Sequence, residues 1–426
     1  MAGFKALKGQ GHAPTLLAAF LYFDFSFMVW TMLGPLSTEI AEALAVNGHI
    51  ITASEKATLL SVPILAGALL RILLGFLVDK IGAKKTALMS QSIVIFTLFF
   101  AYSQGANITY DQLIAVALGL GFAGASFAVA LPQAGQWYPP KLQGIVLGIA
   151  GAGNIGVVID FLFAPKIAEL WGWESVFLVG GVLSTIIFIA YSFMAKDAPK
   201  EVYTPRPKKL RDYGKLLKDK DTWWFSLFYA VSFGGFVGFA GYMKVYLMNT
   251  YQADMSSFGI AVFDETNVKV IAGYFGALTI FAGAILRPVG GAIADKMGGI
   301  KSLYIFFGSV ATLALINALI PLPFWLAIVI IFFIMANLGM ANGAVFQLVP
   351  QRFGKDIGIM TGLVGAAGGI GGTALIQTFG WSKGAFDGYS AGFIIFAIVV
   401  LIAIAGISFV KTRWRTTWGA NAGGII

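Results

Sequence analysis

Long runs of apolar residues, separated by short polar connections, extend along most of the chain. About twelve of these runs reach roughly 20 residues, the length that crosses a hydrocarbon layer ~30 Å thick. They cover residues 15–37, 57–78, 86–104, 110–133, 142–165, 174–195, 222–248, 268–293, 302–322, 323–349, 357–380 and 388–410. An α-helix satisfies its own backbone hydrogen bonds, as lipid requires. The pattern therefore predicts an all-α integral membrane protein of twelve transmembrane helices, with the lipid bilayer as its surroundings.

Charged residues in the connections follow an alternating order. Every second connection is basic: Lys80, Lys84 and Lys85, then Lys141, then 196–221, then Lys296 and Lys301, then Arg352 and Lys355, with Lys411, Arg413 and Arg415 after the last window. The intervening connections carry Glu39, Glu42, Asp111, Glu169, Glu174, Asp254, Asp264 and Asp387. The positive-inside rule then predicts a multi-pass protein of the cell inner (plasma) membrane with both termini in the cytoplasm. The net charge of +9 is thereby a topological signal, and no nucleic-acid partner is expected.

A segment of the second window is repeated later in the chain. GALLRILLGFLVDKIGAKK at 67–85 matches GAILRPVGGAIADKMGGIK at 283–301, so that Arg71 corresponds to Arg287 and Asp79 to Asp295. Two further pairs of segments, GASFAVALPQ with GAVFQLVPQ and AGNIG with AGGIG, repeat in the same order. The repeat predicts two pseudo-symmetric six-helix halves, 1–195 and 222–426, joined by a basic cytoplasmic linker, 196–221. Major-facilitator transporters have this layout, with their sites near the midplane between the halves.

The two repeated arginines lie deep in their windows. Arg71 is eight residues before Asp79, or roughly 12 Å along a helix, which places it near the membrane centre, where an arginine costs about 2.5–3.5 kcal/mol. A two-fold axis would bring Arg71 and Arg287 to one central cavity, where their planar donor forks suit a small planar oxyanion. A structural alternative pairs the arginines with Asp24 and Asp160, the acids inside the windows.

Two glycine-rich segments carry a more specific resemblance. ASFAVALPQAGQWYPPKLQGIVLGIAGAGNIG and NGAVFQLVPQRFGKDIGIMTGLVGAAGGIGG, together with FDFSFMVW and the twin arginines, resemble the nitrate/nitrite porter family of the major facilitator superfamily, most of all its bacterial assimilatory nitrate transporters. The resemblance implies that Arg71 and Arg287 hold nitrate, that Phe127 and Phe346 sandwich it, that Tyr229 and Asn154 supply polar contacts, and that Phe27 and Phe233 line the cavity. Nitrate is planar and very weakly basic, so fixed cations and flat apolar walls suit it.

The segment GxxxDKxGxKK resembles the loop motif of the same superfamily. The resemblance implies that Asp79 and Asp295 form a conformational latch between the halves. The alternative is that both aspartates are solvated loop charges.

Glycines are dense in the fifth and eleventh windows. GLGFAG and GAGNIG satisfy the dinucleotide fingerprint GxGxxG, but they lie inside long apolar windows rather than in a βαβ unit, so no nucleotide or other cofactor is expected. Small residues at helical spacing instead let membrane helices approach closely. The expected packing glycines are Gly144, Gly148, Gly151, Gly153, Gly156, Gly365, Gly368, Gly369 and Gly371.

Energy coupling is expected because moving an anion into an inside-negative cell costs about 2.3 kcal/mol per 100 mV. Exchange for internal nitrite needs only the two arginines, whereas proton symport needs a titratable group. Asp24 is the proton-coupling candidate because it lies in mid-window, one turn before Phe27, and Asp160 lies nearer the outer end of its window. Asp24 could alternatively make a structural contact with another helix. The assimilatory resemblance favours proton-coupled import.

Two other classes of function remain open. A transporter of another small anion, such as a carboxylate, would share the arginines but not the nitrate-type glycine segments. A membrane enzyme would need a catalytic constellation, yet the chain has no cysteine, and its two histidines, His12 and His49, lie outside the windows. We therefore expect a transporter of nitrate and nitrite, with protons as partner, no metal, no enzymatic activity, and function as a monomer.

Overall fold

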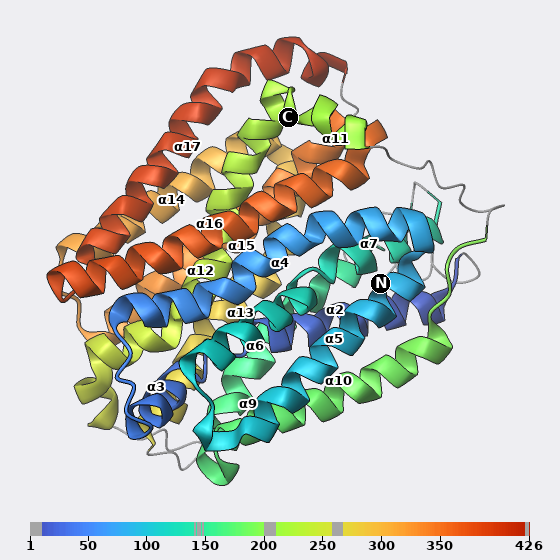
Figure 1. Cartoon of the computed structure of the whole chain (residues 1–426). Helices are drawn as coiled ribbons and strands as arrows, with labels where there is room; N and C mark the ends of the chain where they lie inside the picture. Colours follow the sequence, from blue (N-terminus) through green and yellow to red (C-terminus); the bar gives the residue numbers. More distant parts are fainter. Residues whose placement is uncertain are drawn as a thin grey trace.

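A computed structural model describes residues 11–139, 149–199, 210–257 and 267–421, with positions 142, 146 and 426. Within these residues the regular structure is helical and contains no strand, as Figure 1 shows. Eleven of the helices there are long and apolar enough to cross a membrane. The expected all-α membrane architecture is confirmed. The fifth expected window, 142–165, lies partly outside the described residues, as do Lys141, Gly144, Gly148 and Asp264.

The first half contains the following elements, in chain order. They are α2 (Ala13–Thr31), α3 (Ser37–Val46), α4 (Ala53–Ile81), α5 (Ala83–Gln104), η1 (Gly105–Asn107), α6 (Tyr110–Gly124), α7 (Phe127–Gln136), η3 (Gly151–Ile155), α9 (Gly156–Trp171) and α10 (Glu174–Met194). Two of the expected windows are broken. Gly34 and Pro35 interrupt the first window between α2 and α3, because proline has no backbone N–H for a helix to continue through.

The second half begins with a short helix inside the expected linker. Its elements are α11 (Leu210–Leu217), α12 (Lys220–Ser256), α13 (Val268–Met297), α14 (Gly299–Leu319), α15 (Phe324–Phe353), η5 (Gly354–Asp356), α16 (Ile357–Phe386), α17 (Ser390–Thr416) and η6 (Trp418–Asn421). We call the end of the bundle near α11 the linker end and the opposite end the α3 end. Both marked chain ends in Figure 1 lie toward the linker end.

The sequence repeat has a counterpart in the backbone. Gly82 ends α4 with φ +88°, and Gly298, its match in the repeat, ends α13 with φ +93°. Residues with a side chain rarely adopt this left-handed region, so glycine is required at both turns. The same tight connection therefore follows the arginine-bearing helix in each half.

The two halves meet along α4 and α16, which lie side by side in Figure 1. A Cβ on Gly380 would lie 2.3 Å from the Ala57 Cβ, and one on Gly369 would lie 2.6 Å from the Ala68 Cβ. Gly75 and Gly362 lie about one helical turn nearer the linker end than Arg71 and Gly365. A Cβ added at either glycine would meet no atom of a neighbouring element within 4 Å. The seam is thus closed from the α3 end to the level of Arg71 and open beyond it.

Candidate functional site

Arg71 is the centre of the contact between the halves. It is 1% exposed, and its Nε donates to the Gly124 carbonyl at 3.0 Å while its Nη1 donates to the Gly365 carbonyl at 2.8 Å. Gly124 belongs to the first half and Gly365 to the second, so one guanidinium joins both. The third nitrogen, Nη2, is buried and has no hydrogen-bond partner. One nitrogen of Arg71 is therefore left for a bound group.

A break in the fourth expected window makes the Gly124 carbonyl available. The chain leaves the helix between α6 and α7, where the N–H of Ala128 donates to Ala125 at 3.0 Å instead of continuing the α-helical pattern to Gly124. Gly124 also lets Trp30 approach, since a Cβ there would lie 2.3 Å from the indole. The sequence window showed an unbroken span here, and the break gives Arg71 its acceptor.

Aromatic rings surround the Arg71 guanidinium. Its Cζ lies 5.3 Å from the ring centre of Trp30, 5.4 Å from that of Phe127 and 5.2 Å from that of Phe233. Cations are attracted to ring faces at such distances. Burial of this charge is thus compensated by ring faces and carbonyls, without neutralisation by a carboxylate.

Arg287, the repeat partner of Arg71, lies on the other side of two phenylalanines. Its Cζ is 5.6 Å from the ring centre of Phe346, and the centres of Phe346 and Phe127 are 6.4 Å apart with the ring planes at 70°. Nη1 of Arg287 is buried and unpartnered. The structure therefore brings together the two arginines and the two phenylalanines that sequence analysis singled out, with the rings edge to face in this conformation.

Tyr229 completes this centre from α12. It is 1% exposed, it interacts with both Arg71 and Arg287, and its ring stacks on Phe233 at 5.1 Å with an angle of 4°. Phe233 in turn lies 6.4 Å from Phe27 of the first half. The groups that act electrostatically on Arg71 are Tyr229 and Arg287 rather than a carboxylate. The centre carries an uncompensated positive charge, which suits an anion.

The alternative that pairs the arginines with acids does not describe this conformation. Among the described residues, the ion pairs include neither Arg71 nor Arg287. Asp24 instead accepts a hydrogen bond at 2.8 Å from the backbone N–H of Gly156, the first residue of α9. Asp24 thus makes a structural contact with another helix, which was the alternative to a role in proton coupling. The N-terminus of a helix stabilises a carboxylate.

Asn154 lies in η3, which packs against α2 and α13. It is 2% exposed, and its Oδ1 has no hydrogen-bond partner. These neighbouring helices carry Phe27 and Arg287, so the amide lies in the layer between the halves. An unpartnered buried amide is costly unless a bound group completes its hydrogen bonds.

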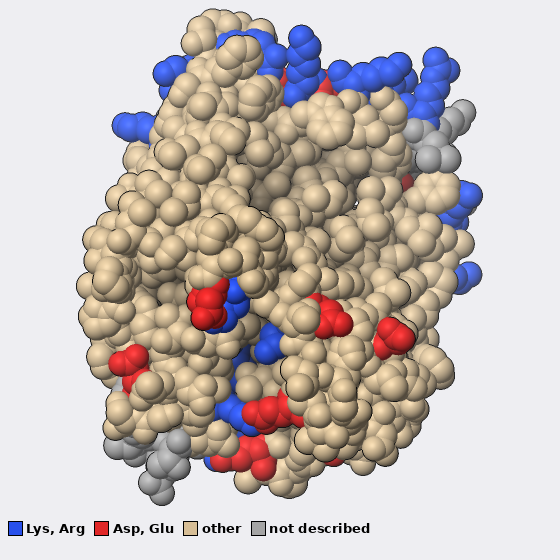
Figure 2. All heavy atoms as spheres, turned by 60° about the vertical axis from the view of Figure 1, so that its left-hand side comes forward, with Lys and Arg blue, Asp and Glu red and all other residues tan. Residues whose placement is uncertain are grey.

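An ionic cluster at the α3 end consists of residues that the sequence pattern did not single out. The Lys244 Nζ lies 2.6 and 2.8 Å from the two carboxylate oxygens of Glu39 and 2.5 Å from the Pro35 carbonyl, and Lys269 pairs with Glu42. Both lysines belong to the second half and both glutamates to the first. Figure 2, which turns this side forward, shows acidic and basic side chains next to one another on a mainly uncharged surface. Lys244 itself, a charge inside the 222–248 window, was the available signal.

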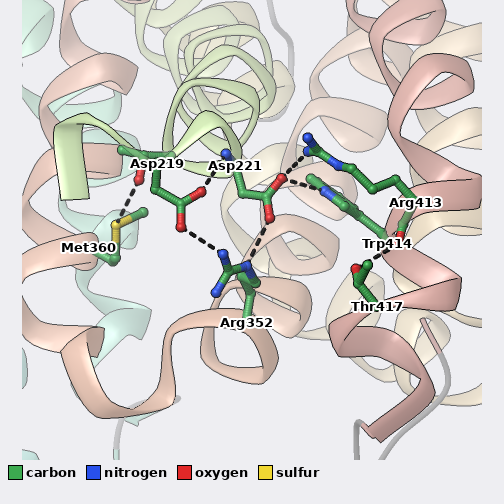
Figure 3. Close-up of polar contacts among 8 residues, drawn as sticks. Asp219, Asp221, Arg352, Met360, Arg413, Trp414 and Thr417 are labelled. Carbon is green, nitrogen blue, oxygen red and sulfur yellow. Dashed lines mark hydrogen bonds and ion pairs between the residues drawn. The ribbon is translucent and has the colours of Figure 1, made fainter. Parts of the chain in front are cut away.

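A second unexpected cluster lies at the linker end (Figure 3). The Asp221 carboxylate accepts from Arg352 Nε at 2.8 Å and from Trp414 Nε1 at 2.7 Å, and it also pairs with Arg413. Asp219 pairs with Arg352 at 2.6 Å. These contacts join the start of α12 to the ends of α15 and α17, so they fix three helices of one half together.

Residues 15–376 match the family model described as Major Facilitator Superfamily. The chain belongs to this superfamily. It is 29% identical to the "Nitrite extrusion protein" of Bacillus subtilis, in an alignment that covers 91% of this chain and 90% of that protein. It is 32% identical to the "Probable nitrate transporter NarT" of Staphylococcus carnosus, with 81% of this chain and 82% of that protein covered. It is also 30% identical to the "Probable nitrate/nitrite transporter NarK2" of Mycobacterium tuberculosis, with 92% of this chain and 95% of that protein covered. The resemblance to the nitrate/nitrite porters is confirmed, and this major-facilitator chain is a multi-pass membrane protein.

The two loop-motif aspartates differ in their surroundings. Asp79 is half-buried at the end of α4 and, together with burial as the larger cause, raises the pKa of Tyr213 on α11. Asp295 is exposed at the end of α13. In this conformation Asp79 thus lies near the linker helix, and the latch role of both aspartates stays a prediction.

Several of the expected packing glycines lie where helices approach closely. A Cβ on Gly156 would lie 2.1 Å from the Asp24 carbonyl, one on Gly371 2.3 Å from the Ala230 carbonyl, and one on Gly368 2.8 Å from Phe233. A Cβ on Gly151 would meet no packed neighbour within 4 Å, and Gly153 lies two residues further along η3. Gly365 faces Arg71, whose Nη1 would be 3.5 Å from the added Cβ.

Proposed function

We propose that this major-facilitator protein is a secondary active transporter that imports nitrate, and nitrite with it, by alternating access. The observation that carries the proposal is the pair of arginines at equivalent positions of the two halves, each with a buried, unpartnered nitrogen. The relatives' names include both anions. A transporter, rather than an enzyme, is the class that the family indicates.

Nitrate suits the chemistry of this centre. It is planar and too weakly basic to share a proton, so it needs fixed donors, and a guanidinium keeps its charge when buried. We propose that the free nitrogens of Arg71 and Arg287 hold its oxygens, that Phe127 and Phe346 cover it from two sides, and that Tyr229 and Asn154 complete its polar contacts. Phe27 and Phe233 would then form the apolar wall.

The contacts along the seam support an inward-open state. The positive-inside rule assigns the basic linker end to the cytoplasm, and the halves are closed at the α3 end. Opening at the α3 end would require the Lys244–Glu39 and Lys269–Glu42 pairs to separate. In that opposite state Asp79 and Asp295 would serve as the latch at the linker end, while the tight glycine faces let the halves slide. A single chain contains both arginines, which supports function as a monomer.

Import against an inside-negative potential favours coupling to protons, and Asp24 and Asp160 are buried carboxylates that belong to neither ionic cluster. Exchange of nitrate for nitrite is the second candidate, because Arg71 carries no carboxylate partner and one relative is named for nitrite extrusion. An empty cationic centre resists closing, and either anion relieves that repulsion.

Liposomes that contain the purified protein and an internal pH dye would test both candidates. External nitrate is added once with an empty lumen and once with nitrite inside. Acidification of the empty lumen would support proton symport, whereas uptake only against internal nitrite, without a pH change, would support exchange. Excess formate as competitor tests the other small anions. Nitrate uptake that persists after Arg71→Gln and Arg287→Gln would contradict the proposed site.

A further inference from the structure

Asp160 is a buried carboxylate that the nitrate centre does not use. It lies on α9, is 3% exposed, and its Oδ2 has no hydrogen-bond partner. Asp24, by contrast, has the N–H of Gly156 as donor. An ionised carboxylate without donors or water costs several kcal/mol, which a bound proton removes. The two buried acids therefore differ in their surroundings: Asp24 has a hydrogen-bond donor, and Asp160 has none at Oδ2.

The cation that interacts electrostatically with Asp160 is Lys244 of the second half. Lys244 is fully buried, but its ammonium group is already held by both oxygens of Glu39 and by the Pro35 carbonyl. An ammonium has three donors, and these contacts use them. While the α3 end is closed, Lys244 is therefore paired with Glu39, and Asp160 Oδ2 has no hydrogen-bond donor.

Among the residues that the structure describes, no charge other than Lys244 compensates Asp160 on α9. The elements packed against it are α2, α10, α13 and η3. Their ionisable groups are Tyr22 and Asp24 on α2, Glu174 and Tyr191 on α10, and Lys269, Tyr274, Arg287, Asp295 and Lys296 on α13. Of the charged groups, Lys244 is the one that acts on Asp160. Across the interface, a Cβ on Gly273 would lie 2.8 Å from the Phe161 carbonyl, so α9 and α13 pack closely next to Asp160 in the chain.

We propose that Asp160 is a proton-binding site that is occupied when the halves close at the α3 end and is emptied when they separate there or when Lys244 is released from Glu39. This inference rests on the proposed function for the direction of the gate: a proton on Asp160 favours the state that is closed at the α3 end, which is the inward-open state. Closing the α3 end confines Asp160 and assigns Lys244 to Glu39, so proton binding and closure accompany each other. The same site then couples the proton to the gate, without a proton acceptor in contact with nitrate.

Infrared difference spectroscopy on purified protein near neutral pH tests the proton site independently of transport. The wild-type spectrum minus that of Asp160→Asn should contain the carbonyl band of a protonated carboxylic acid, and the subtraction with Asp254→Asn, the same change at an exposed carboxylate, should not. Glu39→Gln should weaken the Asp160 band, because Lys244 is then free to pair with Asp160. Absence of the band in the first subtraction overturns the proposal.

Liposomes test the link to the gate. Nitrate–nitrite exchange by the wild type should depend on pH, because each cycle opens the α3 end and empties Asp160. Exchange by Asp160→Asn should be independent of pH, since an amide cannot release a proton, and Asp160→Glu should keep the pH dependence, which separates loss of the proton from loss of the fold. Exchange by Asp160→Asn that keeps the wild-type pH dependence overturns the link to the gate. If the wild type shows the band but moves neither nitrate nor nitrite, the proton site is supported and the proposed function fails.

Discussion

Replacing Arg71 with lysine keeps the charge but removes the geometry that the structure depends on. The guanidinium donates to Gly124 at 3.0 Å and Gly365 at 2.8 Å and still has Nη2 free. A lysine has one nitrogen at one point in space, so it cannot reach both carbonyls and an anion together. We therefore expect Arg71→Lys to lose one charge-assisted hydrogen bond to nitrate.

Such a bond contributes about 1.5–3 kcal/mol, which corresponds to a roughly 10- to 150-fold rise in the Kd for nitrate. Isothermal titration calorimetry on purified protein measures this change directly, and the fluorescence of nearby Trp30 gives a second signal. Arg415→Lys makes the same chemical change at an exposed position of α17 and should leave the Kd unaltered. A Kd for Arg71→Lys within about twofold of wild type would refute the reasoning.

Three further predictions concern packing, the linker end and pH. Gly156→Ala should prevent folding, because its Cβ would lie 2.1 Å from the Asp24 carbonyl. Gly151→Ala should express and transport normally, since the added Cβ would meet no packed neighbour within 4 Å, and equal yields of the two variants would contradict this. Asp221→Asn should lower the thermal stability by about 2 kcal/mol by weakening the cluster of Figure 3, and an unchanged melting temperature would show that the cluster contributes little. Hydrogen bonds from Lys166 and Asn267 hold the pKa of Glu169 below its usual 4.5. The stabilisation from these hydrogen bonds is therefore fully present above pH 4.5 and is lost as the pH falls through the lowered pKa. Glu169→Gln should therefore leave the pH dependence of uptake between about pH 6 and pH 8 unchanged, and an altered profile there would contradict the assignment.

The window pattern and the internal repeat were strong enough to predict the fold class. Helix formation in lipid is dictated by local chemistry, and the paired glycines Gly82 and Gly298 follow directly from the repeat. Helix breaks were less accessible. The break between α6 and α7 lies inside a continuous apolar run, and its importance becomes visible only when the freed Gly124 carbonyl is seen to accept from Arg71.

Arg71 and Arg287 could be identified from the sequence because a deeply buried charge is costly and a repeated one is a strong signal. Lys244 carries a similar signal, yet its partners lie more than two hundred positions earlier in the chain, at Glu39 and Pro35. Neither apolar periodicity nor the repeat relates these positions. Pairing of such groups depends on how the two halves dock.

The sequence by itself determined the membrane class, the two halves, the arginine pair and the family. Each of these depends on which residues lie within a helix turn of one another or at equivalent places in a repeat. Tertiary structure alone decided that Asp24 binds the start of α9, that Asp160 lies apart without a donor at Oδ2, and that Lys244 joins the halves at the α3 end. The physical reason is that these hydrogen bonds and this burial depend on contacts between helices. The sequence of a single helix does not specify how that helix packs against the others.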